Sequence, residues 1–545
     1  MKKVFAILLT TVLLFTIAAC TSQPPSTGGT TSNAPTTDSD DPIEAEMRTV
    51  SILGMDENQL WENREQHESF QAFNELLKKY NLNLVYEVVA MEQYQQVIQT
   101  RTAAALDLPD MVRSEELDLA TILNLGKQGI FTDIRSLLDE FSNGNVDSYV
   151  EKYSKQLWNL TTAPDGNVYW IPSQQLITYK NDEFHSNLTT MVRRDWLDKV
   201  GLEMPTTLDE FRDALRAFQE EDVNESGKKD EAMIYNLAGF EYIAPSFGLP
   251  AGLVMIDIYD DTAKSPWLMK DELVEYITYI NSLVDEGLID VDALDKSNEV
   301  KLQKEKDNMV PAVNDWALGT WHDANVKEYG GFYEPTLLGK TKGDIPRTYA
   351  EDSFSVSSKF SITKNVKDKQ AVATLLDLIY TEEYANLNFY GIEGVSHTVN
   401  EEGTKVFHPN FKDKDFYEIQ STGDYIWNGI LPFMHLSTWE SYILALKVDR
   451  PDLEAYSEKY CIGQEYWYTG DSGLAVPTDE ENATLGRIQN DIKTYSDETL
   501  TKLCLGQFDI ANIDEYIDTI KSLGVEEYVK IYQNRHDRYL SATAK

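Results

Sequence analysis

The chain has 545 residues and carries 91 acidic against 48 basic side chains, for a formal net charge of −43 at pH 7. Such a negative field opposes the basic patch that binding to nucleic acid requires, so we exclude that function. The length is sufficient for two or more domains of ordinary size.

The first twenty residues have the pattern of a secretory signal. Lys2 and Lys3 precede an apolar run, residues 4–17, that is shorter than an ordinary membrane-spanning helix. The run ends in small residues immediately before Cys20, an order that resembles the bacterial lipobox. We expect residues 1–19 to be removed and Cys20 to carry a lipid anchor on the outer side of the cell membrane. The sequence is typical of a protein on the surface of a Gram-positive cell. A plain secretory signal with an incidental cysteine is the alternative.

Residues 21–46 contain almost no large apolar side chain, so they cannot bury enough surface to offset their ordering entropy. We interpret residues 20–46 as the lipidated cysteine and a disordered tether, with a folded body that begins near Met47. Cys461 and Cys504 remain in that body. Two cysteines do not make a disulfide framework, and we expect buried free thiols, with pairing left open.

The folded body begins with a strand–helix–strand pattern. MRTVSILG (47–54) reads as a strand, LNLVYEVV (82–89) as a second strand, and DLPDMV (107–112) contains a third. Between the first two strands, apolar side chains recur at helical spacing: Phe70, Phe73, Leu76, Leu77 and Tyr80. This order is typical of a mostly parallel sheet that is covered by helices.

A second group of elements starts near Leu176. Thr207, followed at the third position by Glu210, predicts a capped helix start. A later helix is expected to stop at Gly287. After Phe360 helical patterns dominate. The fold class predicted from these patterns is α/β, with two lobes and a helix-rich C-terminal part.

Four stretches, in order along the chain, resemble one family. They are RRDWLDKVGLEMPTTLDEF (193–211), LVDEGLID (283–290), YGIEGVSHTV (390–399) and FDIANIDEYIDTIKSLGVEEYVKIYQNRHDRY (508–539). The chain is similar to the family 1 extracellular solute-binding proteins of ABC importers, in particular to the lipoprotein branch that includes the alginate-oligosaccharide binders. The similarity runs from about Met47 to Tyr539.

This resemblance implies a periplasmic-binding-protein fold, in which two α/β lobes joined by a hinge close on a ligand. We expect lobe one to hold residues 47–174 and 309–358, and lobe two residues 175–308 and 359–545. The chain would cross between them near 171–177, 304–311 and 354–362. The resemblance further implies a monomer that captures an oligosaccharide in the interlobe cleft without chemistry and passes it to ABC permease subunits.

The stretch EEDVNESGKKDEAM (220–233) places oxygen-bearing residues at alternate positions, and Gly227 permits a sharp turn. Calcium requires six to eight oxygen ligands, which a tight loop of this kind can supply. An EF-hand closes with Glu at position 12, where this chain has Met233. The resemblance implies closure by adjacent acids instead. We expect a structural Ca²⁺ site, with a solvated turn as the alternative, and the predicted ligands are Asp222, Asn224, Ser226, Lys228 through its carbonyl, Asp230 and Glu231.

Aromatic side chains mark the expected sugar site, because flat rings stack on the apolar faces of sugars. The predicted ligand contacts lie beside the proposed crossings or in loops after strands: Trp61, Trp170, Trp316, Trp321 and Trp427. Ordinary packing is the alternative for each of them, and we expect Trp196 to be core. Arg194, beside Arg193, could bind an acidic sugar, with a surface ion pair as the alternative.

Three other functions stay open at this point. The same fold could bind peptides or lipids, or sense a ligand for a membrane kinase. A secreted polysaccharide-degrading enzyme would need a paired acid and base in the cleft. GDSG (470–473) resembles a serine-protease signature, but none of the seven histidines lies in a suitable sequence frame. We expect no enzyme activity.

Overall fold

The chain divides into two compact units, Met1–Ala45 and Glu46–Lys545, and the residues that the structure describes belong to the second. The computed structural model describes residues 47–56, 64–65, 68–153, 157–172, 188–240, 243–291, 298–316, 331, 333–344, 348–349, 358–400, 403, 405–407, 467–469 and 473–543.

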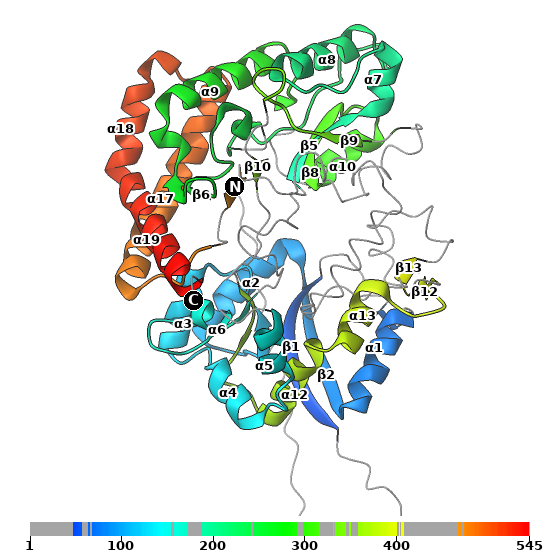
Figure 1. Ribbon diagram of the computed structural model, residues 1–545, viewed down its shortest axis with the longest axis vertical. Helices are drawn as coiled ribbons and strands as arrows, with labels where there is room; N and C mark the ends of the chain where they lie inside the picture. The colour runs from blue at the N-terminus through cyan, green and yellow to red at the C-terminus, as the bar shows by residue number, and fades with distance from the viewer. Residues whose placement is uncertain are drawn as a thin grey trace, which may run out of the picture. The chain divides into compact units, whose positions relative to one another are not determined.

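A five-stranded sheet in the order β2-β1-β3-β11-β4 organises the first lobe (Figure 1). β1 runs parallel to both β2 and β3, whereas β11 is antiparallel to both β3 and β4. The predicted strand–helix–strand unit is therefore confirmed. The strands are β1 (Arg48–Asp56), β2 (Leu82–Ala90), β3 (Met111–Arg113), β4 (Ile171–Pro172) and β11 (Ser358–Ile362).

Helices cover both faces of this sheet, as the burial of β1 requires. Val50 and Ile52 pack in one core with α1, α4, α5 and α12, and Leu53 and Met55 pack in another with α2 and α3. This alternation follows from the two-residue period of a strand. The helices of the first lobe are α1 (Glu68–Lys79), α2 (Met91–Ala104), α3 (Leu119–Lys127), α4 (Ile134–Phe141), α5 (Asn145–Tyr153), α6 (Leu157–Thr161), α12 (Lys369–Ile379) and α13 (Glu382–Tyr390).

A buried carboxylate ties three segments of the first lobe together. Asp110 is 4% exposed, and its Oδ2 accepts hydrogen bonds from the Ser51 backbone N–H at 2.8 Å and from the Ser51 hydroxyl at 2.6 Å. Its Oδ1 accepts from the Lys367 N–H at 3.0 Å. The carboxylate therefore links β1, the entry to β3 and the loop after β11.

The second lobe contains two further sheets, in the orders β8-β5-β9 and β10-β14-β6-β7. A separate hairpin pairs β12 with β13. These strands are β5 (Leu188–Arg193), β6 (Met255–Asp257), β7 (Thr262–Lys264), β8 (Ala312–Trp316), β9 (Tyr333–Thr336), β10 (Thr348–Tyr349), β12 (His397–Val399), β13 (Lys405–Phe407) and β14 (Trp467–Thr469).

Helices supply most of the core of the second lobe, and α17 packs against α9, α18 and α19 (Figure 1). Cys504 lies in this core as a free thiol, and burial raises its pKa to about 12; Cys461 lies outside the described residues. These helices are α7 (Arg194–Val200), α8 (Leu208–Glu220), α9 (Lys270–Asp285), α10 (Asn298–Lys306), α17 (Asp479–Cys504), α18 (Ile513–Leu523) and α19 (Val525–Thr543), with short 3-10 turns η2 (Ala244–Phe247), η3 (Pro266–Leu268) and η6 (Ile510–Asn512).

The predicted helix signals hold, with one change of detail. The Thr207 hydroxyl accepts from the Glu210 N–H at 3.2 Å, but the Glu210 carboxylate reaches back to the N–H of Thr206 rather than of Thr207. α9 ends before Gly287, which has φ 70°. No helix in the described part of the chain has the length and apolarity that crossing a membrane would take.

Backbone pairing departs from the predicted lobe boundaries in two segments. Residues 309–358 were placed in lobe one, but β8 and β9 both pair with β5, and β10 pairs with β14. Residues from 359 onward were placed in lobe two, but β11 completes the first sheet and α12 packs in its core. The predicted crossing near 304–311 therefore stays within the second lobe. Backbone pairing and burial, rather than sequence order, decide the membership of these short strands.

We expect Asp110→Ala to lower the free energy of unfolding by about 2 kcal/mol, because it leaves part-buried N–H groups of β1 and of the loop after β11 without this acceptor. Urea unfolding followed by circular dichroism measures the change. Glu140→Ala, at an exposed position of α4, is the control and should be neutral. Equal stability of the two variants would contradict the proposed role of Asp110.

Candidate functional site

The predicted metal loop follows α8 and is tightly curled. Asp222, Glu225 and Gly227 all have positive φ, at 49°, 61° and 74°. The Gly227 N–H donates to both carboxylate oxygens of Asp222, at 3.2 and 3.0 Å. Asn224 Nδ2 and the Ser226 hydroxyl each donate to Asp230 Oδ1 at 2.9 Å. The loop thus brings the expected oxygen-bearing side chains into one turn.

Glu231 is the distinctive residue of this loop. It is 0% exposed, and its Oε2 has no hydrogen-bond partner within the described part of the chain. Burial, followed by the charges of Asp230 and Asp222, raises the pKa of this carboxyl above its usual value. A buried carboxylate beside two further acids lacks a compensating positive charge.

The donor set of the loop fits a hard cation such as calcium, because every expected ligand is an oxygen. The Lys228 carbonyl also faces the loop, within 3.5 Å of the Ser226 hydroxyl. Among the residues that the structure describes, however, no three acidic, histidine or cysteine side chains are gathered closely enough to hold a metal ion as they stand. Hydrogen bonds from Asn224 and Ser226 occupy the Asp230 oxygen instead.

A second candidate site is a cavity of about 380 Å³, within the size range of small-molecule pockets. One wall is the segment after β3, residues 115–118, together with the first turns of α3. Glu115, Glu116 and Asp118 contribute carboxylates to this wall, and Leu117 and Ile122 contribute apolar surface. The carboxyl ends of parallel strands are where open α/β sheets bind their ligands.

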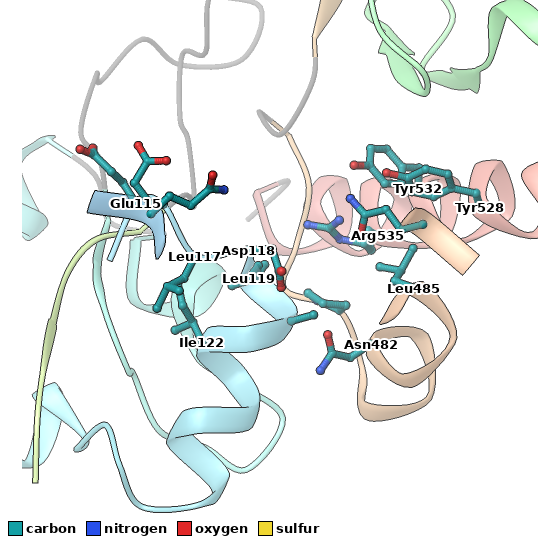
Figure 2. A pocket seen from close by; sticks show the side chains of 15 residues that line it. Glu115, Leu117, Asp118, Leu119, Ile122, Asn482, Leu485, Tyr528, Tyr532 and Arg535 are labelled. Carbon is teal, nitrogen blue, oxygen red and sulfur yellow. The ribbon is translucent and has the colours of Figure 1, made fainter. Parts of the chain in front are cut away.

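The opposite wall comes from two C-terminal helices. α17 contributes Asn482, Leu485 and Gln489, and α19 contributes side chains at a similar helical spacing. Residues three, four and seven positions apart share one face of a helix, so each helix presents a stripe to the cavity. Figure 2 shows the α19 residues across the cavity from Glu115 and Asp118; they are Tyr528, Tyr532 and Arg535.

Hydrogen bonds between α17 and α19 hold this second wall together. Arg538 on α19 donates to both carboxylate oxygens of Glu481 on α17, at 2.9 and 2.6 Å. Although burial favours the neutral form, Arg538 and Thr478 hold the pKa of Glu481 below its usual value. Lys127 at the end of α3 pairs with Asp479, which joins the two walls of the cavity.

Two largely buried polar side chains of the second wall line the cavity. Asn482 is 5% exposed, and its Oδ1 accepts no hydrogen bond within the described residues. Arg535 is 4% exposed; its Nε donates to the Ala475 carbonyl at 2.8 Å, and its guanidinium lies over the Tyr532 ring. Buried polar groups are nearly always bonded, so such an unfilled acceptor indicates a ligand or water partner.

The first wall carries the negative charge. Glu115 pairs with the buried Arg113 behind it, and Asp118 caps α3 by accepting from the Thr121 N–H at 2.6 Å. Glu116 lies half-buried between them. The cavity therefore offers several hydrogen-bond acceptors on one side and the donors of Arg535 on the other.

Few of the predicted ligand contacts can be compared with this geometry. Trp170 is 0% exposed and packs in the core beside α2 and α3, which favours the packing alternative, and its ligand contact stays a prediction. Trp316 ends β8, where it pairs with Leu188 of β5. Arg194 is bonded to Asp198 at 2.5 Å, as a helix-surface ion pair. Cys20, Trp61, Trp321 and Trp427 lie outside the described residues.

The lining residues of the cavity were not predicted from the sequence. The stripe Tyr528, Tyr532, Arg535 is visible as a helical pattern in α19, but nothing local indicates that it faces the loop after β3. Trp196, expected in the core, is fully buried beneath the Arg193 guanidinium, 4.4 Å from the ring centre.

Two packed α/β lobes with a polar cavity define a protein that binds a small solute. The chain belongs to the bacterial extracellular solute-binding protein family, whose model matches residues 64–386. This membership confirms the predicted family and places the chain among binding proteins.

Three relatives are similar in sequence. The fructooligosaccharide ABC transporter substrate-binding protein FusA of Streptococcus pneumoniae is 26% identical over 53% of this chain and 54% of its own length. The polygalacturonan/rhamnogalacturonan-binding protein YtcQ of Bacillus subtilis is 26% identical over 55% and 58%. Lipoprotein LipO of Bacillus subtilis is 23% identical over 74% and 76%. The chain thus matches only about half the length of the first two relatives.

Solved structures confirm the predicted fold class. Streptococcus pneumoniae FusA in complex with kestose superposes with a TM-score of 0.70 over 91% of this chain and all of that structure, at 18% identity. The alginate-binding protein AlgQ2, solved without calcium ion, gives 0.67 over 90% and 98%, at 20% identity. Both support a periplasmic-binding-protein-like α/β fold with a helix-rich C-terminal part.

We expect Glu231→Gln to stabilise the chelator-treated protein at pH 8 by roughly 1 kcal/mol, because it removes an uncompensated buried charge. The pKa of Glu231 is higher in the folded state than its ordinary value of 4.5. Protonated Glu231 therefore makes its full contribution to the stability of the wild type below pH 4.5, and this contribution is lost as the pH rises through the raised pKa. The difference in free energy of unfolding between the variant and the wild type should become smaller toward pH 5. Urea unfolding at both pH values measures this difference, and Glu225→Gln, at an exposed position of the same loop, is the control. The same pH dependence of stability in the variant and in the wild type would contradict the prediction.

Proposed function

We propose that this protein is the lipid-anchored substrate-binding component of an ABC importer and that it captures an oligosaccharide. Membership of the solute-binding family supports the class. The names of two relatives, one binding fructooligosaccharides and one binding polygalacturonan and rhamnogalacturonan, support a carbohydrate ligand.

The proposed anchor is a lipid on Cys20, which the tether of residues 20–46 joins to the folded body on the outer surface of a Gram-positive cell. Similarity to a lipoprotein over most of the chain supports it. A tethered monomer of this kind would collect solute outside the cell and pass it to permease subunits in the membrane.

The observation that carries the carbohydrate proposal is the polar cavity between the β3 segment and the C-terminal helices. Carboxylate acceptors, the guanidinium of Arg535 and the unfilled Asn482 acceptor match the alternating donors and acceptors of a sugar. Tyr528 and Tyr532 supply ring surface at its rim. Trp61, Trp316, Trp321 and Trp427 remain predicted contacts with further sugar units.

We also propose a structural Ca²⁺ in the loop that follows α8. The unpartnered, buried Glu231 oxygen supports it, as do the all-oxygen donors of Asp222, Asn224, Ser226, Asp230 and the Lys228 carbonyl. Solved structures of this fold include a FusA EF-hand mutant and AlgQ2 without calcium ion, which also supports a calcium loop here. The ion would neutralise the buried acids and pin the loop.

We expect the purified protein to gain thermal stability with at least one neutral or acidic oligosaccharide from a panel that includes kestose, nystose and oligogalacturonides. Binding to the folded state alone raises the free energy of unfolding by roughly 2–3 kcal/mol at a ligand concentration about 100-fold above Kd. Chromatography of the incubated sugar should return it intact. Shortened products would favour the polysaccharide-degrading alternative, and the absence of any shift across the panel would overturn the carbohydrate proposal.

We expect calcium to raise the melting temperature of chelator-treated protein, because it binds only the folded loop. Asp222→Asn and Glu231→Gln should abolish this response, whereas Lys228→Ala should keep it, since only the backbone carbonyl at that position would bind the ion. Differential scanning calorimetry with and without calcium measures the response. A wild-type protein that does not respond to calcium would leave the loop as a solvated turn.

A further inference from the structure

The charges that line the cavity are unequal on its two walls. Glu115, Glu116 and Asp118 stand on the β3 side, and Arg535 stands on the side of the C-terminal helices. Figure 2 shows Glu115 and Asp118 on one side of the cavity and Arg535 on the other. Glu115 is already paired with Arg113, so the carboxylates of Glu116 and Asp118 carry the excess negative charge of the lining, against the one guanidinium of Arg535.

We infer that this cavity selects uncharged sugar units and discriminates against uronic acids. The inference rests on the proposed function, because it narrows the class of oligosaccharide that the same cavity accepts. It is not settled by the relatives, whose names include binders of fructooligosaccharides as well as of polygalacturonan.

The hydrogen-bonding capacity of the cavity favours hydroxyl groups. The carboxylates of Glu116 and Asp118 accept hydrogen bonds and donate none. Each hydroxyl of a neutral sugar can donate to one of these acceptors and accept from Arg535. A uronate carboxylate has no proton to donate, so it satisfies fewer of them.

Electrostatics acts in the same direction. Arg535 is already engaged through its Nε with the Ala475 carbonyl and through its flat face with Tyr532. A uronate bound beside it would also lie in a cavity of about 380 Å³ with the carboxylates of the opposite wall. Like charges repel more strongly where water is partly excluded, and the net charge of −43 adds to that repulsion.

Isothermal titration of the purified protein tests the inference with tri-galacturonate, its methyl ester, galactotriose and kestose as probes. At least one uncharged trisaccharide should bind tenfold or more tightly than tri-galacturonate. Equal or tighter binding of tri-galacturonate than of every neutral probe would overturn the inference while leaving carbohydrate binding intact. Failure of all probes, charged and uncharged, would overturn the proposed function itself.

Variants connect the selectivity to this cavity. Asn482→Leu should weaken the binding of the tightest-binding neutral probe about tenfold. It should leave the melting temperature of the protein equal or higher, because it replaces a buried acceptor that has no hydrogen bond with an apolar side chain of similar size. Glu116→Gln should reduce the difference in affinity between the uronate and its methyl ester several-fold. Added salt should reduce the same difference in the wild type.

Glu526→Gln is the matched control, since it removes a carboxylate from an exposed position of α19 that does not line the cavity. This variant should bind every probe with the affinity of the wild type, so the difference in affinity between the uronate and its ester should be unchanged. If the Asn482 and Glu116 variants also bind as the wild type does, the cavity does not select the sugar and the inference is wrong.

Discussion

The C-terminal helix α19 is the constraint on which the candidate cavity depends. Tyr528 and Ile531 pack in the core of the second lobe, whereas Tyr539, further along the same helix, packs in the core of the first. Its bidentate bond from Arg538 to Glu481 fixes the start of α17 beside it. A partly buried ion pair of this kind contributes more to geometry than to net stability. Here that geometry places two helical stripes opposite the loop after β3.

Local periodicity was sufficient to predict the elements but not their partners. The alternation of Val50 and Ile52 with Leu53 and Met55 is contained in nine residues of β1, so the first strand and its parallel neighbour could be predicted. β11 is five residues long and pairs with strands far away in the sequence. A strand that short carries no information about which sheet it will join, and the backbone pairing departs from the predicted lobe boundaries for that reason.

The same distinction separates the two candidate sites. The oxygen-rich loop after α8 lies within ten residues, and its spacing was readable because a tight turn brings alternate side chains together. The cavity combines the segment after β3 with faces of α17 and α19, and only the tertiary structure places these segments together. Trp170 shows that a residue singled out from the sequence can also turn out to pack in a core. An aromatic residue next to a strand has the same appearance in sequence whether it packs in a core or faces a ligand.

Two buried oxygens without hydrogen-bond partners in the described chain indicate different missing groups. Glu231 Oε2 is charged, fully enclosed and surrounded by further acids, so a neutral hydroxyl donor would leave the repulsion among those acids in place. A bound cation compensates both the desolvation and the repulsion, as protonation of the carboxyl also does. Asn482 Oδ1 is neutral and borders a cavity that opens between two walls, where a hydroxyl satisfies it and a cation would meet the Arg535 guanidinium. The chemistry of these two oxygens therefore supports the proposal of a metal in the loop and of a sugar in the cavity.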